Sequence, residues 1–182
     1  MAHFQPRLPG FPPPAPASEA FEARDALRDY PNIGGNTMAR FAKQLGAAGE
    51  LLFDSVLMRL GERVIPSSEH EPFDRVLWLP DALVRVQIKT RHVISDGQYV
   101  FTIRKGYQRG PSGTKPYARG EFDLLALVIL PESVIKFTSE WRSTHRVAAA
   151  EIPGLRNAPG ASLRQALADL GLSGTAPAPS AT

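Results

Sequence analysis

Three polar side chains with complementary chemistry are brought together by a predicted hairpin. In the stretch Leu83–Thr90, strand alternation places Gln87 and Lys89 on one face, roughly 6 to 7 Å apart along the strand. Asp74 lies thirteen residues before Gln87, at the start of the preceding β-rich run. A turn at Pro80–Asp81 between the two runs folds Asp74 back toward Lys89. A carboxylate, an amide and an amine are therefore expected at one place.

A second carboxylate, that of Glu50, comes from the helix predicted before this hairpin. Glu50 lies at the margin of the apolar stripe of that helix, so a helix packed on the sheet aims it at the same place. Such a set of groups suits the hydrolysis of a phosphodiester bond. Hard oxygen ligands hold Mg²⁺, which binds a phosphate oxygen and acidifies a water molecule. A lysine beside that water orients or deprotonates it, or adds positive charge in the transition state.

The helix that carries Glu50 is predicted over Thr37–Leu60, because apolar residues recur along it every three or four positions. Gly61 follows at the usual C-cap position, so the helix is expected to end there. A shorter helix is predicted over Glu19–Arg28, before a Pro31 that stops it.

Runs of β-forming residues predict a sheet between the helices. The predicted strands are Arg63–Ile65, Phe73–Leu79, Leu83–Thr90, Gln98–Arg104, Phe122–Leu130 and Val134–Thr138. The stretch Lys105–Gly120 is rich in Gly and Pro and is predicted to be a loop. A last helix is expected to begin with a capping box of Ser162 and Gln165 and to end at Gly171. This order predicts an α/β or α+β fold, in which a central mixed β-sheet is flanked by helices.

The composition is that of a soluble chain with one hydrophobic core, since 43% of its 182 residues are hydrophobic. The absence of Cys excludes a disulfide framework, a Cys-ligated zinc and a thiol nucleophile. The longest strongly apolar run, Leu124–Leu130, is far shorter than the ~20 residues of a membrane helix. We therefore expect a cytoplasmic protein with a single domain over residues 18–172. Its Pro-rich arm, residues 1–17, and its tail, residues 173–182, are predicted to be disordered.

The net charge of +3 is unevenly distributed along the chain. Residues 85–119 hold eight Lys and Arg against one Asp, a net +7, which leaves 13 cations and 17 acids, a net −4, elsewhere. Clustered cations bind the phosphate backbone of nucleic acids, and tyrosines bond phosphate or stack on bases. The residues predicted to contact DNA are Arg85, Arg91, Arg104, Lys105, Tyr107, Arg109, Lys115, Tyr117 and Arg119.

Over roughly residues 35–138, the chain resembles the PD-(D/E)XK nuclease superfamily. More narrowly, it is similar to the branch that contains bacterial homing-type endonucleases and Holliday-junction-resolvase-like proteins. In that branch a helix Glu precedes a V-I-P strand, an Asp and a V-Q-x-K-T strand. The same order appears here as Glu50, Val64-Ile65-Pro66, Asp74 and Val86-Gln87-Ile88-Lys89-Thr90.

The resemblance implies a restriction-endonuclease-like core and an endodeoxyribonuclease, a hydrolase that depends on Mg²⁺ or Mn²⁺ and cuts duplex or branched DNA. It implies that Glu50 and Asp74 are metal ligands and that Gln87 is a ligand of the metal or its water. It further implies that Lys89 is the catalytic lysine and that the Ile88 carbonyl faces the metal. Because one site per chain would have to cut two strands, a homodimer or higher oligomer is expected.

Gln87 stands where the superfamily name expects Asp or Glu, and its amide keeps a carbonyl oxygen but carries no negative charge. The alternative prediction is therefore a nuclease fold kept as a non-catalytic DNA-binding or assembly protein. Glu69 and Glu71 flank the same loop and are alternative metal ligands. A third reading is an adaptor that binds partners through its Pro-rich arm. The pattern is equally consistent with a junction, a nick, a recognition site or RNA as substrate.

Overall fold

The computed structural model describes residues 17–106 and 113–172, which form two compact units divided between residues 42 and 43. The helices of the first unit are α1 (Ala17–Ala26) and α2 (Gly35–Arg40). The short helix predicted over Glu19–Arg28 corresponds to α1, which ends two residues earlier. The predicted arm and tail lie outside the described residues, apart from Ala17. The single domain predicted over residues 18–172 stays a prediction.

The long helix predicted over Thr37–Leu60 is two helices in the structure, so this prediction is wrong at its start. Here α2 ends at Arg40 and α3 runs over Ala42–Arg59, with Phe41 between them in a non-helical conformation (φ −101°, ψ 20°). No residue of α2 is buried, whereas the apolar stripe of α3 is buried from Leu45 onward. Because most helical stability comes from packing of the apolar face, the continuous pattern does not hold one helix together.

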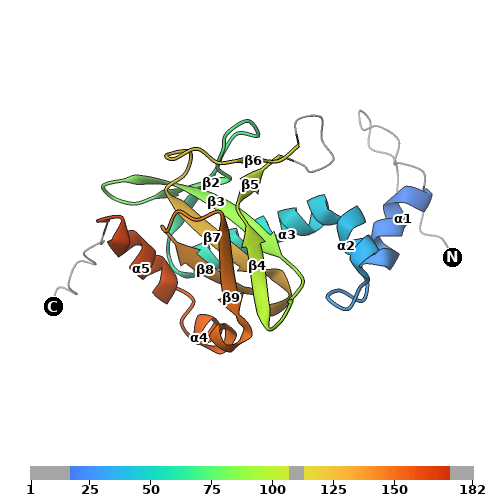
Figure 1. Ribbon diagram of the computed structural model, residues 1–182. Helices are drawn as coiled ribbons and strands as arrows, with labels where there is room; N and C mark the ends of the chain where they lie inside the picture. Colours follow the sequence, from blue (N-terminus) through green and yellow to red (C-terminus); the bar gives the residue numbers. More distant parts are fainter. Residues whose placement is uncertain (1–16, 107–112, 173–182) are drawn as a thin grey trace, which may run out of the picture. The chain divides into compact units, whose positions relative to one another are not determined.

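A mixed five-stranded sheet is the centre of the second unit (Figure 1). Its strands in spatial order are β1 (Arg63–Pro66), β2 (Arg75–Trp78), β3 (Leu83–Arg91), β7 (Leu124–Ile129) and β8 (Val134–Thr138). β3 and β7 are parallel, and the other neighbours are antiparallel. The predicted hairpin is the β2–β3 pair, whose turn is closed by a hydrogen bond from Leu79 N to Ala82 O at 2.9 Å. The predicted mixed sheet flanked by helices is therefore confirmed.

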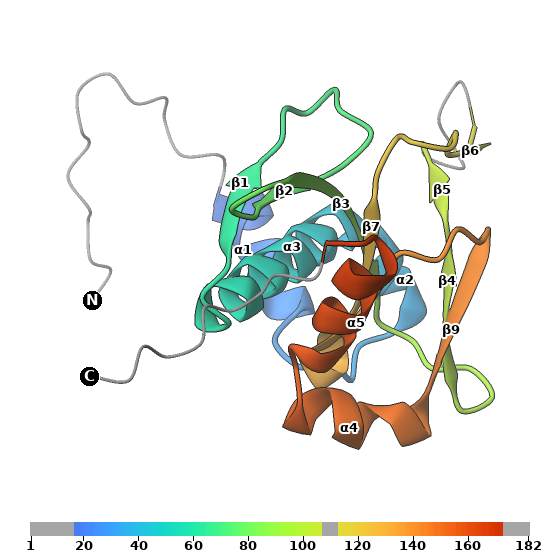
Figure 2. The same ribbon diagram turned by 90° about the vertical axis from the view of Figure 1, so that its left-hand side faces the viewer.

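Two helices, α3 and α5 (Ala161–Asp169), cover one face of this sheet (Figure 2). Phe53 and Leu57 of α3 are fully buried against alternate residues of the strands, and Leu163 of α5 joins the same cluster. Every residue of β7 is buried, as expected for a central strand covered on both faces. The strand residues in this first cluster are Leu77, Val84, Val86, Ile88, Leu124, Ala126, Val128, Ile135 and Phe137.

The opposite face of β7 is covered by an antiparallel ribbon of β4 (Gln98–Thr102) and β9 (Thr144–Ala148). Tyr99 and Phe101 of β4 and Val147 of β9 pack there against Leu125 and its neighbours. β9 has few apolar residues and no prediction covers it, because its pairing with β4 joins segments far apart in the sequence. The remaining elements are β5 (Arg104–Lys105), β6 (Lys115–Pro116), η1 (Leu130–Glu132), η2 (Ala149–Glu151) and α4 (Ile152–Asn157).

Of two predicted helix ends, the structure confirms one and contradicts the other. Gly61 has the left-handed conformation (φ 81°) of a C-cap, and the prediction there is confirmed. The predicted capping box of the last helix is wrong, because α5 begins at Ala161, one residue before Ser162. The Ser162 hydroxyl instead accepts a hydrogen bond from Phe137 N of β8 at 3.1 Å. None of the described helices combines the length and the apolarity that crossing a membrane requires.

Candidate active site

The predicted site residues gather where two segments approach one end of the sheet. The loop that joins β1 to β2 and the small β5–β6 pair both lie at this end (Figures 1 and 2). Asp74 is the last residue of that loop, and its N donates to Val86 O at 2.9 Å, which continues the β2–β3 ladder by one position. The backbone of the hairpin therefore fixes where Asp74 stands.

The turn at Pro80–Asp81 is predicted to fold Asp74 back toward Lys89, and in the structure the side chain that Asp74 contacts across this hairpin is that of Gln87. Gln87 Nε2 donates to Asp74 Oδ2 at 2.5 Å, and the backbone N of Ile88 donates to the same oxygen at 2.7 Å. Gln87 Nε2 also donates to the Ile88 carbonyl at 3.1 Å. Gln87 is buried, with 4% of its surface exposed, so these bonds are made away from bulk water.

Lys89 lies two residues further along the same face of β3, as strand alternation predicts. Its Nζ donates to the carbonyl oxygen of Arg104 at 3.1 Å and to the hydroxyl oxygen of Tyr117 at 2.9 Å. Burial lowers the pKa of Lys89, and the negative charge of Asp74 opposes this shift. The charge of Asp74 therefore acts on Lys89, while the hydrogen bonds of Lys89 go to the β5–β6 segment.

Glu50 reaches the site from α3 through an arginine that the sequence patterns did not single out. Arg75 Nη1 donates to Glu50 Oε2 at 3.1 Å and to the backbone carbonyl of Asp74 at 2.8 Å. The same guanidinium binds both carboxylate oxygens of Asp54, through Nε at 2.8 Å and Nη2 at 2.9 Å. Arg75 therefore ties α3 to the start of β2 and holds Glu50 beside Asp74.

The electrostatics of Asp74 show a carboxylate in an unfavourable place for its charge. Burial is the largest cause that raises its pKa, and the nearby negative charge of Glu50 raises it further. The hydrogen bond from Ile88 N and the positive charges of Lys89 and Arg75 act in the opposite direction. The net shift is upward, so the site would be stabilised by one more positive charge next to Asp74.

The donor groups fit a hard divalent cation. Asp74 Oδ2 and the Ile88 carbonyl oxygen both accept a hydrogen bond from Gln87 Nε2, so two hard oxygens lie beside the same amide group. Arg75 joins the carboxylate of Glu50 to the backbone carbonyl of Asp74 beside these oxygens. Carboxylate, amide and carbonyl oxygens are the ligands that Mg²⁺ and Mn²⁺ prefer. Gln87 would present its Oε1 only with the amide turned over, and amide orientation follows the surrounding hydrogen bonds.

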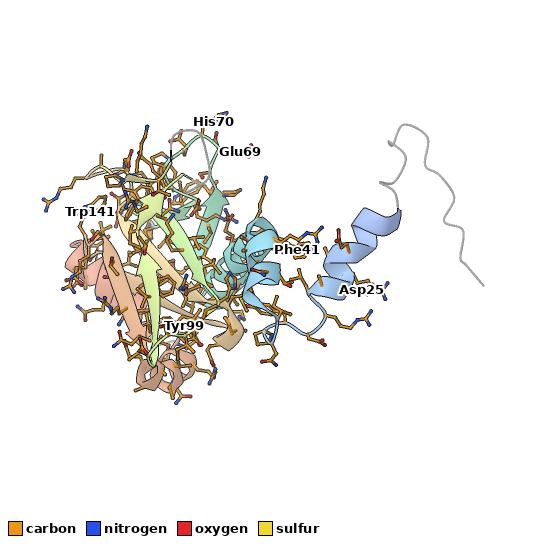
Figure 3. The ribbon with its side chains drawn as sticks, turned by 45° about the vertical axis from the view of Figure 1, so that its right-hand side comes forward. Asp25, Phe41, Glu69, His70, Tyr99 and Trp141 are labelled. Carbon is orange, nitrogen blue, oxygen red and sulfur yellow. The ribbon has the colours of Figure 1, made fainter. Side chains whose placement is uncertain are left out.

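The alternative ligands Glu69 and Glu71 are both exposed on the loop between β1 and β2. Figure 3 shows Glu69 and His70 at the outer part of this loop. Across residues 17–106 and 113–172, no group of three or more His, Asp or Glu side chains is placed to hold a metal ion. A metal at this site would therefore rely on two carboxylates and on neutral oxygens.

The residues predicted to contact DNA fall into three groups. In the first group the side chain is bonded to another side chain of the protein. Arg85 binds Asp123, through Nε at 2.9 Å and Nη2 at 2.7 Å, and Lys105 binds Glu121. Tyr117 bonds to Lys89. Exposed side chains make up the second group, which consists of Arg91, Arg104, Lys115 and Arg119. Tyr107 and Arg109 lie outside the described residues. DNA contact stays a prediction for all nine.

Two site residues that sequence reasoning missed had local signals. Arg75 directly follows Asp74, and the alternation of β2 turns neighbouring side chains to opposite faces of the sheet. Asp54 lies four residues after Glu50, on the same face of α3. Two local signals point to this ion-pair cluster. One is the cation that follows a candidate acid, and the other is the i,i+4 pair of acids on the preceding helix.

Comparisons with known proteins concern the family and the fold of the chain. A family model described as PD-(D/E)XK endonuclease matches residues 41–145. The fold is similar to that of a bacterial homing endonuclease, I-Ssp6803I, with a TM-score of 0.51 and 17% sequence identity. The superposition covers 58% of this chain and 77% of that chain, and at this identity it concerns the fold alone. No curated protein matches the chain. The narrower branch predicted from Gln87 and Lys89 stays a prediction.

Proposed function

Because the chain belongs to the PD-(D/E)XK endonuclease family, we propose that it hydrolyses phosphodiester bonds in duplex or branched DNA with Mg²⁺ or Mn²⁺ as cofactor. The observation that carries the proposal is the contact between Asp74 and Gln87 at the β2–β3 hairpin, with Lys89 two residues further along the same strand and Glu50 joined to Asp74 through Arg75. Burial raises the pKa of Asp74, and a cation bound beside this carboxylate would favour its charged form.

In this proposal Glu50 and Asp74 hold the metal ion through their carboxylates. Gln87 and the Ile88 carbonyl complete the set of oxygen ligands. Such an ion supplies Lewis-acid activation of water and neutralises charge on the phosphate. Lys89 carries out the second task from the same strand face: it orients or deprotonates the attacking water, or adds positive charge beside the phosphate. Burial lowers the pKa of Lys89, which favours the proton-accepting role.

A cleavage assay tests the proposal. Supercoiled plasmid and a synthetic four-way junction are incubated with the full-length protein and Mg²⁺, and nicked and linear products are measured over time. Asp74→Ala and Lys89→Ala are expected to lower the rate at least ~100-fold. Asp81→Ala, an exposed aspartate in the turn of the same hairpin, is the matched control and is expected to cleave normally.

Absence of cleavage by the wild-type protein on every DNA form would overturn the catalytic proposal, as would undiminished cleavage by Asp74→Ala. A comparison of Glu69→Ala with Glu50→Ala tests which of these two glutamates binds the metal ion. We expect only the substitution of Glu50 to raise the Mg²⁺ concentration needed for half-maximal activity.

A second candidate function has one specific observation in its favour. The Gln87 amide nitrogen donates hydrogen bonds to both Asp74 Oδ2 and the Ile88 carbonyl, so these two oxygens have a partner within the protein. A nuclease fold kept as a DNA-binding or assembly protein would keep this hydrogen-bonded arrangement. In that case DNA binding should weaken steeply as salt is raised, need no divalent ion and be accompanied by no cleavage.

We also propose that cutting both strands requires a second copy of the chain, because the part of the chain that the structure describes offers one candidate site. Light scattering of the protein alone and with a duplex distinguishes the outcomes. A monomer on DNA that still makes double-strand breaks in single binding events would contradict this proposal.

A further inference from the structure

Within the described residues, the two hydrogen bonds that Lys89 Nζ donates go to one small substructure. Arg104, whose carbonyl accepts the first hydrogen bond, lies in β5, and Tyr117, whose hydroxyl accepts the second, directly follows β6. β5 and β6 pair with each other, with Arg104 opposite Pro116. The Lys89 amine, which extends from β3, is therefore bonded by this pair of short strands.

The ring of Tyr117 is fixed by aromatic packing. It meets Phe122 edge-on, with centroids 5.1 Å apart and an interplanar angle of 83°. Phe122 is buried and stacks in turn on Trp141, with centroids 4.8 Å apart and planes 25° from parallel. Such edge-to-face and stacked contacts are specific in geometry as well as favourable in energy. The hydroxyl of Tyr117 is therefore held in one direction.

The backbone next to Tyr117 is held as well. Glu121 Oε2 accepts a hydrogen bond from Ala118 N at 2.8 Å, and the same carboxylate binds Lys105. The ammonium groups of Lys89 and Lys105 lie 5.0 and 5.7 Å from the centroid of the Tyr117 ring, which attracts both. Burial raises the pKa of Tyr117, so its hydroxyl keeps its proton.

From this arrangement we propose that Tyr117 is a positioning residue for Lys89, whose amine it aims at the reacting phosphate. This inference rests on the proposed nuclease function and assigns a role within it. A direct contact between the Tyr117 hydroxyl and DNA is the competing role. A second competitor is a latch, in which Tyr117 holds Lys89 away from its working position until DNA binds.

The Tyr117→Phe variant tests the proposal, because it removes one hydroxyl and keeps the ring. Tyr99→Phe is the matched control: Tyr99 belongs to the same hydrophobic cluster, its hydroxyl lies 3.4 Å from Glu132, and Figure 3 shows it at the opposite end of the ribbon from Trp141. We expect Tyr117→Phe to lower kcat about tenfold or more, with KM and the Kd for DNA unchanged. We expect Tyr99→Phe to leave all three unchanged.

The other kinetic outcomes overturn the proposal. A raised KM with normal kcat assigns Tyr117 to DNA contact, and a raised kcat assigns it to a latch. Equal losses in Tyr117→Phe and Tyr99→Phe would overturn it too, because they would indicate a general effect of hydroxyl removal on the cluster. The split between kcat and KM is a readout that a purely structural role would not produce.

A readout without activity separates this proposal from the nuclease function itself. The rate at which an amine-reactive acylating reagent labels Lys89 is measured by peptide mass spectrometry, relative to the exposed Lys43. Tyr117→Phe is expected to raise the relative labelling of Lys89 severalfold, because the amine loses the Tyr117 hydroxyl as a hydrogen-bond acceptor. Unchanged labelling overturns the positioning role whether or not the wild-type protein cleaves DNA. Loss of wild-type cleavage with raised labelling overturns the nuclease function alone.

Discussion

Gly49 is the point at which α3 comes nearest to β3, and it offers a quantitative test of the packing that positions Glu50. A Cβ added at Gly49 would lie 2.0 Å from Thr90 Oγ1, 2.8 Å from its Cγ2 and 3.0 Å from its Cβ. Rotation of the Thr90 side chain does not move its Cβ, because the strand backbone fixes that atom. Gly49→Ala therefore forces α3 and β3 apart or strains Thr90.

The expected size of the effect follows from two opposing contributions. Replacing Gly by Ala inside a helix normally stabilises it by about 1 kcal/mol, whereas overpacking a core costs about 1 to 3 kcal/mol. Gly46 lies on the same helix with no atom within 4 Å of its added Cβ, so Gly46→Ala should show only the gain. The two variants should therefore differ by about 1 to 3 kcal/mol in the free energy of unfolding, with Gly49→Ala the less stable.

Urea unfolding followed by circular dichroism measures the effect in the two single variants, in Thr90→Ala and in Gly49→Ala/Thr90→Ala. The Thr90→Ala change removes the two atoms that clash most, so the double variant should recover most of the loss. A small deficit is expected to remain, because the Cβ of residue 90 stays at 3.0 Å. Equal stabilisation by Gly46→Ala and Gly49→Ala, or no recovery in the double variant, would refute the close approach of α3 to β3.

Two further predictions concern ion pairs. Arg75→Lys should lower the free energy of unfolding by about 1 to 3 kcal/mol in urea titrations, because an ammonium cannot bind both oxygens of Asp54 as the guanidinium does; an unchanged midpoint would contradict it. The bonds from Arg85 hold the pKa of Asp123 below its usual range, so this pair stabilises the fold above the unfolded pKa of about 3.9 and loses its effect as the pH falls through the lower folded value. The difference in unfolding free energy between the wild type and Asp123→Asn, measured from pH 7 down to pH 2, should therefore shrink toward acid, and a difference independent of pH would refute the assignment.

The predicted part of the site rests on relations that are short in sequence. Gln87 and Lys89 share a face of β3 because side chains alternate along any strand. Asp74 reaches Gln87 because a tight turn at Pro80–Asp81 leaves one register for the two strands on either side of it. Both relations follow from local backbone geometry, which is why they could be predicted before the fold was known.

The errors of prediction arise where local signals compete with packing. The apolar stripe of the predicted helix Thr37–Leu60 starts at Met38 and continues through Phe41. Only its residues from Leu45 onward are buried, and the helix is divided before them. Ser162 has the residue type and spacing of a helix cap, but a backbone N–H of β8 needs an acceptor at that place and takes its hydroxyl. In both cases the local pattern is present, and contacts with residues far away in the sequence determine which structure forms.

The sequence by itself determined the strand face, the hairpin and the set of chemical groups that meet there, because these depend on residue type, alternation and turn geometry. Only the tertiary structure decided which groups surround them. Tyr117 meets Lys89 across 28 positions, and Arg75 joins Glu50 across 25. Contacts of that separation depend on how helices, strands and ribbon pack together, and packing of buried surfaces is a property of the whole fold that no short stretch of sequence carries.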